Sequence, residues 1–292
     1  MLSVFAAVFV GAPFGDPADV WKVRSRRLED GQEKVVVTDY DWIPKATAVV
    51  VIDMWDDHHC KAAAARVAEM APAMNTALKR ARSEGALIIH APSDCADFYK
   101  DSPARKRALA APKVKAPTKF QWNNFDPKRE AGLAPKLEEG GCSCDTPEPC
   151  SPSVRKWTKE TRLLEIDPDK DVVSADGQEI FNVLKDRRIE TVVLMGVHTN
   201  RCVLGRPFGI RQMVMLKEAG ELKNVVLCRD LTDSYHRDPG HHFEGLHEII
   251  AHVERHWCPT IESSGLSGNS DVADRLKPFR FKDDKTTPLA QK

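Results

Sequence analysis

A cysteine and an aspartate stand where each could take part in nucleophilic chemistry. Cys202 lies in "VVLMGVHTNRCVLGRPFGIRQM", in which an apolar strand-like run turns at Gly196 and continues as a predicted helix from about Asn200. The free N–H groups and the dipole at a helix N-terminus favour a thiolate and can bind an oxyanion. Most free cysteines are small buried hydrophobes, however, so Cys202 needs a base before it counts as a nucleophile.

Asp53 is the candidate base. It ends the apolar run "VVVID", and the carboxyl ends of neighbouring parallel strands meet at one edge of a sheet. An aspartate at such a position can also cap the next helix or pair with a surface cation. Paired with Cys202 on another strand, Asp53 becomes the partner that a thiol nucleophile requires.

Strand and helix patterns alternate along the chain. The sequence predicts strands over 46–54, 86–92, 162–166, 191–197 and 224–230, and helices over 62–85, 177–188 and 242–257. Pro72 is expected to kink the first helix or to begin a second one. Near-continuous apolar strands separated by helices indicate an α/β fold with a single doubly wound, mostly parallel sheet and helices on both faces.

We expect one α/β domain over 35–260, with a long loop insertion at 111–160 and a polar tail over 261–292. Residues 1–34 form a separate N-terminal segment. Its apolar start has the length of a signal peptide but lacks a basic n-region, so cytoplasmic and exported locations both stay open.

The composition excludes some classes of partner. The 43 Lys and Arg balance the 43 Asp and Glu, which disfavours electrostatic binding of nucleic acid or of an anionic membrane. No apolar run is long enough for a membrane span. Cys142, Cys144 and Cys150 cluster in the insertion, as a disulfide staple, plain loop cysteines or part of a metal site. Because no C-x-x-C pair and no nearby fourth ligand accompany them, we expect no metal there.

Two motifs resemble a known family. "AVVVIDMWDD" followed by "VVLMGVHTNRCV" is similar to the isochorismatase-like cysteine hydrolases, which include nicotinamidases. The resemblance implies a Rossmann-like three-layer fold with catalytic Asp53, Lys170 and Cys202. It also implies a cis peptide between Val197 and His198, which would direct the backbone N–H groups of His198 and Cys202 at one oxyanion.

The family lysine is matched only in part. "PDKDVVSADGQEI" offers Lys170 before Ser174 and Ala175, but the following aromatic is replaced by Asp176. Lys170 also has a surface explanation, as a solvated turn residue between two acids. Lys119 in the long loop is a weaker substitute.

Six further residues are candidates for binding the substrate: Trp55, His90, Trp122, Phe125, Arg206 and Tyr235. Each also has a packing or salt-bridge interpretation. The metal site of nicotinamidases is not matched in "IIHAPSDC", so we expect neither a bound metal nor another cofactor.

The sequence therefore predicts a cysteine hydrolase that cleaves a small amide or related carbonyl compound through a Cys202 thioacyl intermediate. Two alternatives remain: a vinyl-ether hydrolase of the isochorismatase type, and a non-catalytic small-molecule-binding protein on the same fold. The expected partner is a small-molecule substrate. We expect no binding of nucleic acid and no membrane span, and the sequence leaves open whether the chain forms a homo-oligomer.

Overall fold

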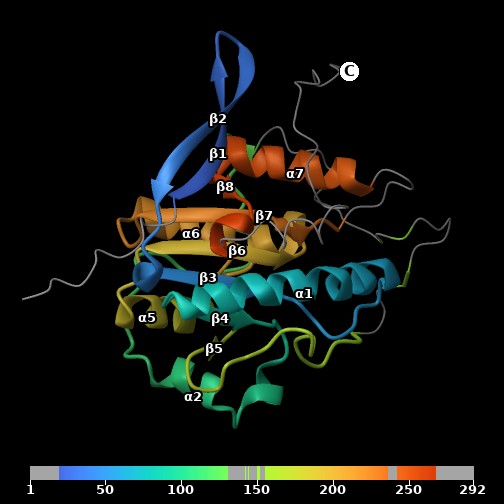
Figure 1. Ribbon diagram of the computed structural model, residues 1–292, viewed down its shortest axis with the longest axis vertical. Helices are drawn as coiled ribbons and strands as arrows, with labels where there is room; N and C mark the ends of the chain where they lie inside the picture. The colour runs from blue at the N-terminus through green and yellow to red at the C-terminus, as the bar shows by residue number, and fades with distance from the viewer. Residues whose placement is uncertain are drawn as a thin grey trace, which may run out of the picture.

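The fold is an α/β arrangement around one twisted sheet, shown in Figure 1. This computed structural model describes residues 20–130, 142, 144, 150–151, 155–235 and 242–267. Its eight strands lie in the order β2-β1-β8-β7-β6-β3-β4-β5. They are β1 (Val20–Glu29), β2 (Gln32–Asp41), β3 (Thr47–Ile52), β4 (Leu87–Ala91), β5 (Val172–Val173), β6 (Thr191–Val197), β7 (Asn224–Asp233) and β8 (Thr260–Ile261).

The strands β5, β4, β3, β6, β7 and β8, neighbours in that order, all run parallel. At the β8 edge, β1 pairs antiparallel with β8, and β2 pairs antiparallel with β1. β3 and β6 are buried at every position and apolar after their first threonine, as expected of strands covered on both faces. The prediction of a mostly parallel α/β sheet is confirmed.

Helices cover both faces of the sheet. The described helices are α1 (Lys61–Ser83), α2 (Pro103–Ala110), α3 (Pro127–Glu130), α5 (Gly177–Asp186), α6 (Ile210–Glu218), α7 (His242–His256) and α8 (Ser264–Ser267), with short helical turns η1 (Pro44–Ala46), η2 (Ala96–Tyr99) and η3 (Thr199–Val203). The apolar faces of α1 and α8 pack on one side of the sheet, and those of α5, α6 and α7 pack on the other. Within the described part of the chain, none of these helices is long and apolar enough to cross a membrane.

Two local expectations need correction. The predicted strand over 162–166 is wrong: this segment is a turn that places Leu164 in the core under α1, and its backbone N–H groups bond locally or to Asn75 rather than to a strand. Pro72 does not begin a second helix, because α1 runs continuously from Lys61 to Ser83.

The β1–β2 hairpin is an element that the predicted strands omit. It turns at Asp30 and Gly31, which both have positive φ, and Asp-Gly is a favoured pair for a two-residue hairpin turn. β1 pairs with β8 through Arg24 and Thr260, so the sheet begins before residue 35, the expected start of the domain.

Candidate active site

The site lies where β3 and β6 end side by side. Ile52 pairs with Gly196, so Asp53 and the turn after β6 leave the sheet at neighbouring points. Gly196 has φ of 108°, and a Cβ on it would lie 2.1 Å from the Ile52 carbonyl oxygen. Only glycine therefore allows the two strands to approach this closely beside Asp53.

Asp53 is held rigidly at this edge. Its backbone has φ of 50°, a left-handed conformation that aspartate adopts more readily than most residues. The side chain is fully buried, and Oδ1 accepts a 2.7 Å hydrogen bond from the Ser93 backbone N–H. Trp55 supports this arrangement, since its indole N–H donates to the Ser93 carbonyl at 3.1 Å.

The second oxygen of Asp53 meets a cation. Arg206 Nε donates to Asp53 Oδ2 at 3.0 Å, and the Arg206 side chain is mostly buried. The Cys202 thiol lies beside the same carboxylate, close enough for the Asp53 charge to act on it, and is 8% exposed. One buried cluster therefore holds a thiol, a carboxylate and a guanidinium.

Burial determines the protonation of this cluster. It raises the pKa of the Cys202 thiol well above its usual range, and the nearby Asp53 charge raises it further. Burial also raises the pKa of Asp53, against the opposing influence of Arg206 and the Ser93 N–H group. The expected lowering of the Cys202 pKa by a helix N-terminus is thus wrong for the resting site, in which the thiol keeps its proton beside the Asp53–Arg206 ion pair.

The turn that carries Cys202 differs from an ordinary helix start. The peptide between Val197 and His198 is cis, as the family resemblance implies. η3 (Thr199–Val203) is a wide helical turn rather than the first turn of α6. Asn200 fixes the turn to the end of β7 through two hydrogen bonds with the Tyr235 backbone, of 2.8 and 2.9 Å.

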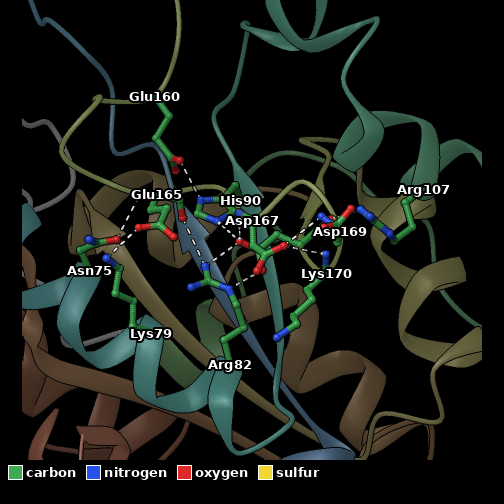
Figure 2. Close-up of polar contacts among 11 residues, drawn as sticks. Asn75, Lys79, Arg82, His90, Arg107, Glu160, Glu165, Asp167, Asp169 and Lys170 are labelled. Atoms are coloured by element: carbon green, nitrogen blue, oxygen red, sulfur yellow. Dashed lines mark hydrogen bonds and ion pairs between the residues drawn. The ribbon is translucent and has the colours of Figure 1, made fainter.

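Lys170 is not part of this cluster. It is exposed on the turn before β5, where its backbone N–H bonds to Asp167, and its side chain points away from the polar network of Figure 2. Among the described residues, no ion pair or hydrogen bond joins the Lys170 ammonium to Asp53 or Cys202. The predicted position of the third residue is therefore wrong, and Arg206 supplies the cation instead.

Trp122 covers the outer side of Arg206, with the guanidinium 5.1 Å from the centre of its ring. The loop that carries Trp122 is tied to the segment after Cys202, since the Asn123 N–H donates to the Gly205 carbonyl at 2.7 Å. Trp122 and Phe125 are half exposed and border a surface hollow of about 580 Å³, which Asp53, Cys202 and Arg206 do not line. Trp122 of the insertion thus lies against the outer side of the cluster.

Stacked rings form another wall. Trp55 stacks on Trp157 with ring centres 4.3 Å apart, and His58 stacks on Trp157 at 5.4 Å. Tyr235 packs 4.9 Å from His198, and its hydroxyl bonds to His59 Nε2 at 2.8 Å. Trp55 and Tyr235 are each only 6% exposed, so other parts of the protein surround both rings.

His90 does not line the site. It is fully buried between two carboxylates, with Nδ1 2.7 Å from Glu160 and Nε2 3.2 Å from Asp171 (Figure 2). Asp171 also accepts two hydrogen bonds from Arg82, of 2.8 and 2.6 Å. Burial alone would lower the pKa of His90, but the Glu160 charge and the Asp171 hydrogen bond outweigh it and raise the pKa to about 9. His90 is therefore a buried cation, and its predicted role in substrate binding is wrong.

Ser93 and Trp157 also shape the site without having been predicted to do so. Ser93 acts through its backbone N–H, and a sequence gives no signal for such a contact. Trp157 lies in the insertion, more than 100 residues from Trp55. The only sign in the sequence that it packs against the domain is the presence of a tryptophan in a polar loop.

Comparison with known proteins gives similarity of fold alone. No family model matches the chain, and a search of curated proteins finds no match. Similar solved structures include a cysteine hydrolase from Pseudomonas syringae pv. phaseolicola 1448A (14% identity, TM-score 0.45, 82% of this chain and 97% of that one). They also include an isochorismatase family protein from Burkholderia thailandensis (14%, 0.43, 81% and 97%) and the MAR1 ribonuclease from Caenorhabditis elegans (14%, 0.36, 86% and 98%).

Proposed function

We propose that this protein is a cysteine hydrolase that cleaves a small amide or a related carbonyl compound. The observation that carries the proposal is the buried contact of the Cys202 thiol with Asp53, whose other oxygen is paired with Arg206. A thiol nucleophile requires a neighbouring base, and Asp53 is the acid that lies beside Cys202.

The reaction begins with a proton transfer. Asp53 takes the proton of Cys202, and the sulfur attacks the substrate carbonyl carbon, so an S–C bond forms and the carbonyl π electrons move to oxygen. The backbone N–H groups of His198 and Cys202 stabilise that oxyanion. Asp53 then returns the proton to the leaving amine as the C–N bond breaks. Asp53 then takes a proton from water, whose oxygen bonds to the acyl carbon. The C–S bond breaks, the carboxylic acid leaves, and Asp53 returns the proton to the Cys202 sulfur.

Arg206 keeps this transfer electrostatically balanced. Before the transfer its positive charge faces the Asp53 carboxylate, and afterwards it faces the thiolate, so the net charge of the buried cluster does not change. In a medium of low dielectric constant, an unbalanced charge at this point would cost several kcal/mol. Arg206 therefore serves the purpose for which the sequence suggested Lys170.

The enclosure of the site favours a small substrate. Cys202 is 8% exposed, and Trp122 on Arg206 narrows the approach from the insertion side. Arg206 donates to Asp53 through Nε, and its role in binding a substrate carboxylate stays a prediction.

A panel of small amides tests the proposal, with released ammonia or amine as the measurement. The wild-type protein and the Cys258→Ala variant should release product, whereas Cys202→Ala should not. Cys258 is a matched control because its thiol is also buried but lies against Val253 and Leu227, away from Asp53.

Two results would contradict the proposal. Amine release that persists in Cys202→Ala would exclude Cys202 as the nucleophile. Saturable binding of a panel compound without turnover by any variant would favour a binding protein.

A further inference from the structure

Four cysteines meet at the N-terminus of α1. Cys60, the residue before α1, has its sulfur 3.5 Å from that of Cys142 and 3.6 Å from that of Cys144. The sulfurs of Cys144 and Cys150 are also 3.6 Å apart, and all four lie within 4.8 Å of one another. Cys60 thus supplies a fourth thiol, although it is far from the other three cysteines in the sequence. The expectation that no fourth ligand lies nearby is therefore wrong.

The spacing of the sulfurs matches one metal ion. Thiolates bind Zn²⁺ tetrahedrally at a Zn–S distance of about 2.3 Å, which places neighbouring sulfurs about 3.8 Å apart. The observed separations of 3.5 and 3.6 Å are close to this value. Disulfides would join the sulfurs in pairs without gathering all four, and a polynuclear cluster would spread them more widely because several metal and sulfide ions lie between them.

Backbone N–H groups surround these sulfurs. Ala62 donates to the Cys144 sulfur at 3.4 Å, and the Cys144 N–H donates to the Cys142 sulfur at 3.3 Å. Both Cys60 and Ala62 belong to the start of a 23-residue helix, where the helix dipole favours negative charge. A tetrathiolate site with a divalent ion carries a net charge of about −2, which such donors stabilise.

We propose that Cys60, Cys142, Cys144 and Cys150 bind one Zn²⁺ ion in a closed, structural site. Four thiolates leave no open coordination position, so the ion does not act on a substrate. It fastens the insertion to the first turn of α1, seven residues after Asp53.

The site also supports one wall of the candidate active site. Tyr235 packs in the same cluster as Cys60 and Cys142, and its other contacts reach His59 and His198. Loss of the ion would therefore loosen this wall without removing a catalytic group. The proposal does not depend on the hydrolase function, because its test measures metal.

The metal content of the full-length chain tests the proposal. The protein is purified under reducing conditions without chelator, and its zinc and iron are measured by plasma mass spectrometry. We expect about one zinc ion per chain in the wild type and in Cys258→Ser, and at least roughly tenfold less bound zinc in Cys60→Ser and Cys150→Ser. Cys150 is only partly buried, so its variant should fold even where the loss of the buried Cys60 thiol prevents folding.

Cobalt gives a second measurement that does not depend on catalysis. Co²⁺ added to the zinc-depleted wild type should give the visible absorption of a tetrahedral thiolate site, which Cys150→Ser should lack. The proposal is overturned by wild-type protein that lacks stoichiometric zinc, by iron in place of zinc, by zinc retained in both variants, or by disulfides among these four cysteines in non-reducing digests.

Discussion

The buried cation His90 should make the stability of this protein depend on pH. The pKa of His90 rises from 6.5 to about 9 on folding, because its imidazolium lies between Glu160 and Asp171. A shift of about 2.5 pH units corresponds to about 3 kcal/mol of stability, at 1.36 kcal/mol per unit. Since the folded-state pKa is the higher one, this contribution is fully present below pH 6.5 and is lost as the pH rises towards 9.

Thermal unfolding at several pH values measures the effect. The fluorescence of the six tryptophans reports the unfolding. Between about pH 6.5 and about pH 8.5 the His90 contribution should fall by roughly 2 kcal/mol, which lowers Tm by about 4 to 8 °C. Glutamine cannot titrate, so the same scan of His90→Gln gives the pH dependence of Tm that comes from all other groups. Subtracting it from the wild-type scan leaves the contribution of His90. Its Tm should be lower near pH 6.5 and should change less with pH than that of the wild type.

A second variant tests the cause of the shift. Glu160→Gln removes one of the two carboxylates that face His90, so the pKa of His90 should fall and the loss of stability should begin at lower pH. If the wild type and His90→Gln lose the same Tm over this range, His90 is not a buried cation and the reasoning fails.

Four further outcomes are expected. Asp53→Asn should lower turnover by about 10² to 10⁴ with an unchanged circular dichroism spectrum, because asparagine tolerates the positive φ of 50° but accepts no proton; full activity would exclude Asp53 as the base. Arg206→Gln should move the acid limb of the activity profile to higher pH, because the Asp53 pKa rises without its cation, while Arg206→Lys should move it less; equal profiles would contradict the pairing. Gly196→Ala should cost several kcal/mol more stability than Gly220→Ala in urea unfolding, since both glycines have positive φ but only Gly196 lacks room for a Cβ; equal losses would argue against the close approach. Cys202 should react with iodoacetamide more slowly than an exposed thiol near neutral pH, because its pKa is raised; rapid selective labelling would indicate a thiolate at rest.

The parallel sheet and the pairing of Asp53 with Cys202 could be predicted because both depend on local patterns. Buried strands appear as continuous apolar runs, and parallel strands bring their carboxyl ends to one edge. The hairpin at Asp30 and Gly31 was not predicted, because its strands are mostly polar and half exposed.

The cations and thiols could not be placed in the same way. Whether Lys170 or Arg206 reaches Asp53 depends on how the chain leaves β6, and the sequence does not specify that path. His90 looked like a residue at the site edge because its two carboxylate partners lie 70 and 81 residues away. Cys60 is 82 residues from Cys142, so only the tertiary fold reveals the fourth thiol.

The central place of β3 in the sheet has a consequence for synthesis of the chain. β3 begins at Thr47, but its partner β6 begins only at Thr191, 144 residues later. At about 5 to 20 residues per second, β6 emerges roughly 7 to 29 s after β3. Throughout that time one edge of the apolar strand "TAVVVI" has no native partner, and such edges pair readily with other chains. The connectivity that brings Asp53 to Cys202 therefore leaves the nascent chain most prone to aggregation, and most dependent on chaperones, before its second half is made.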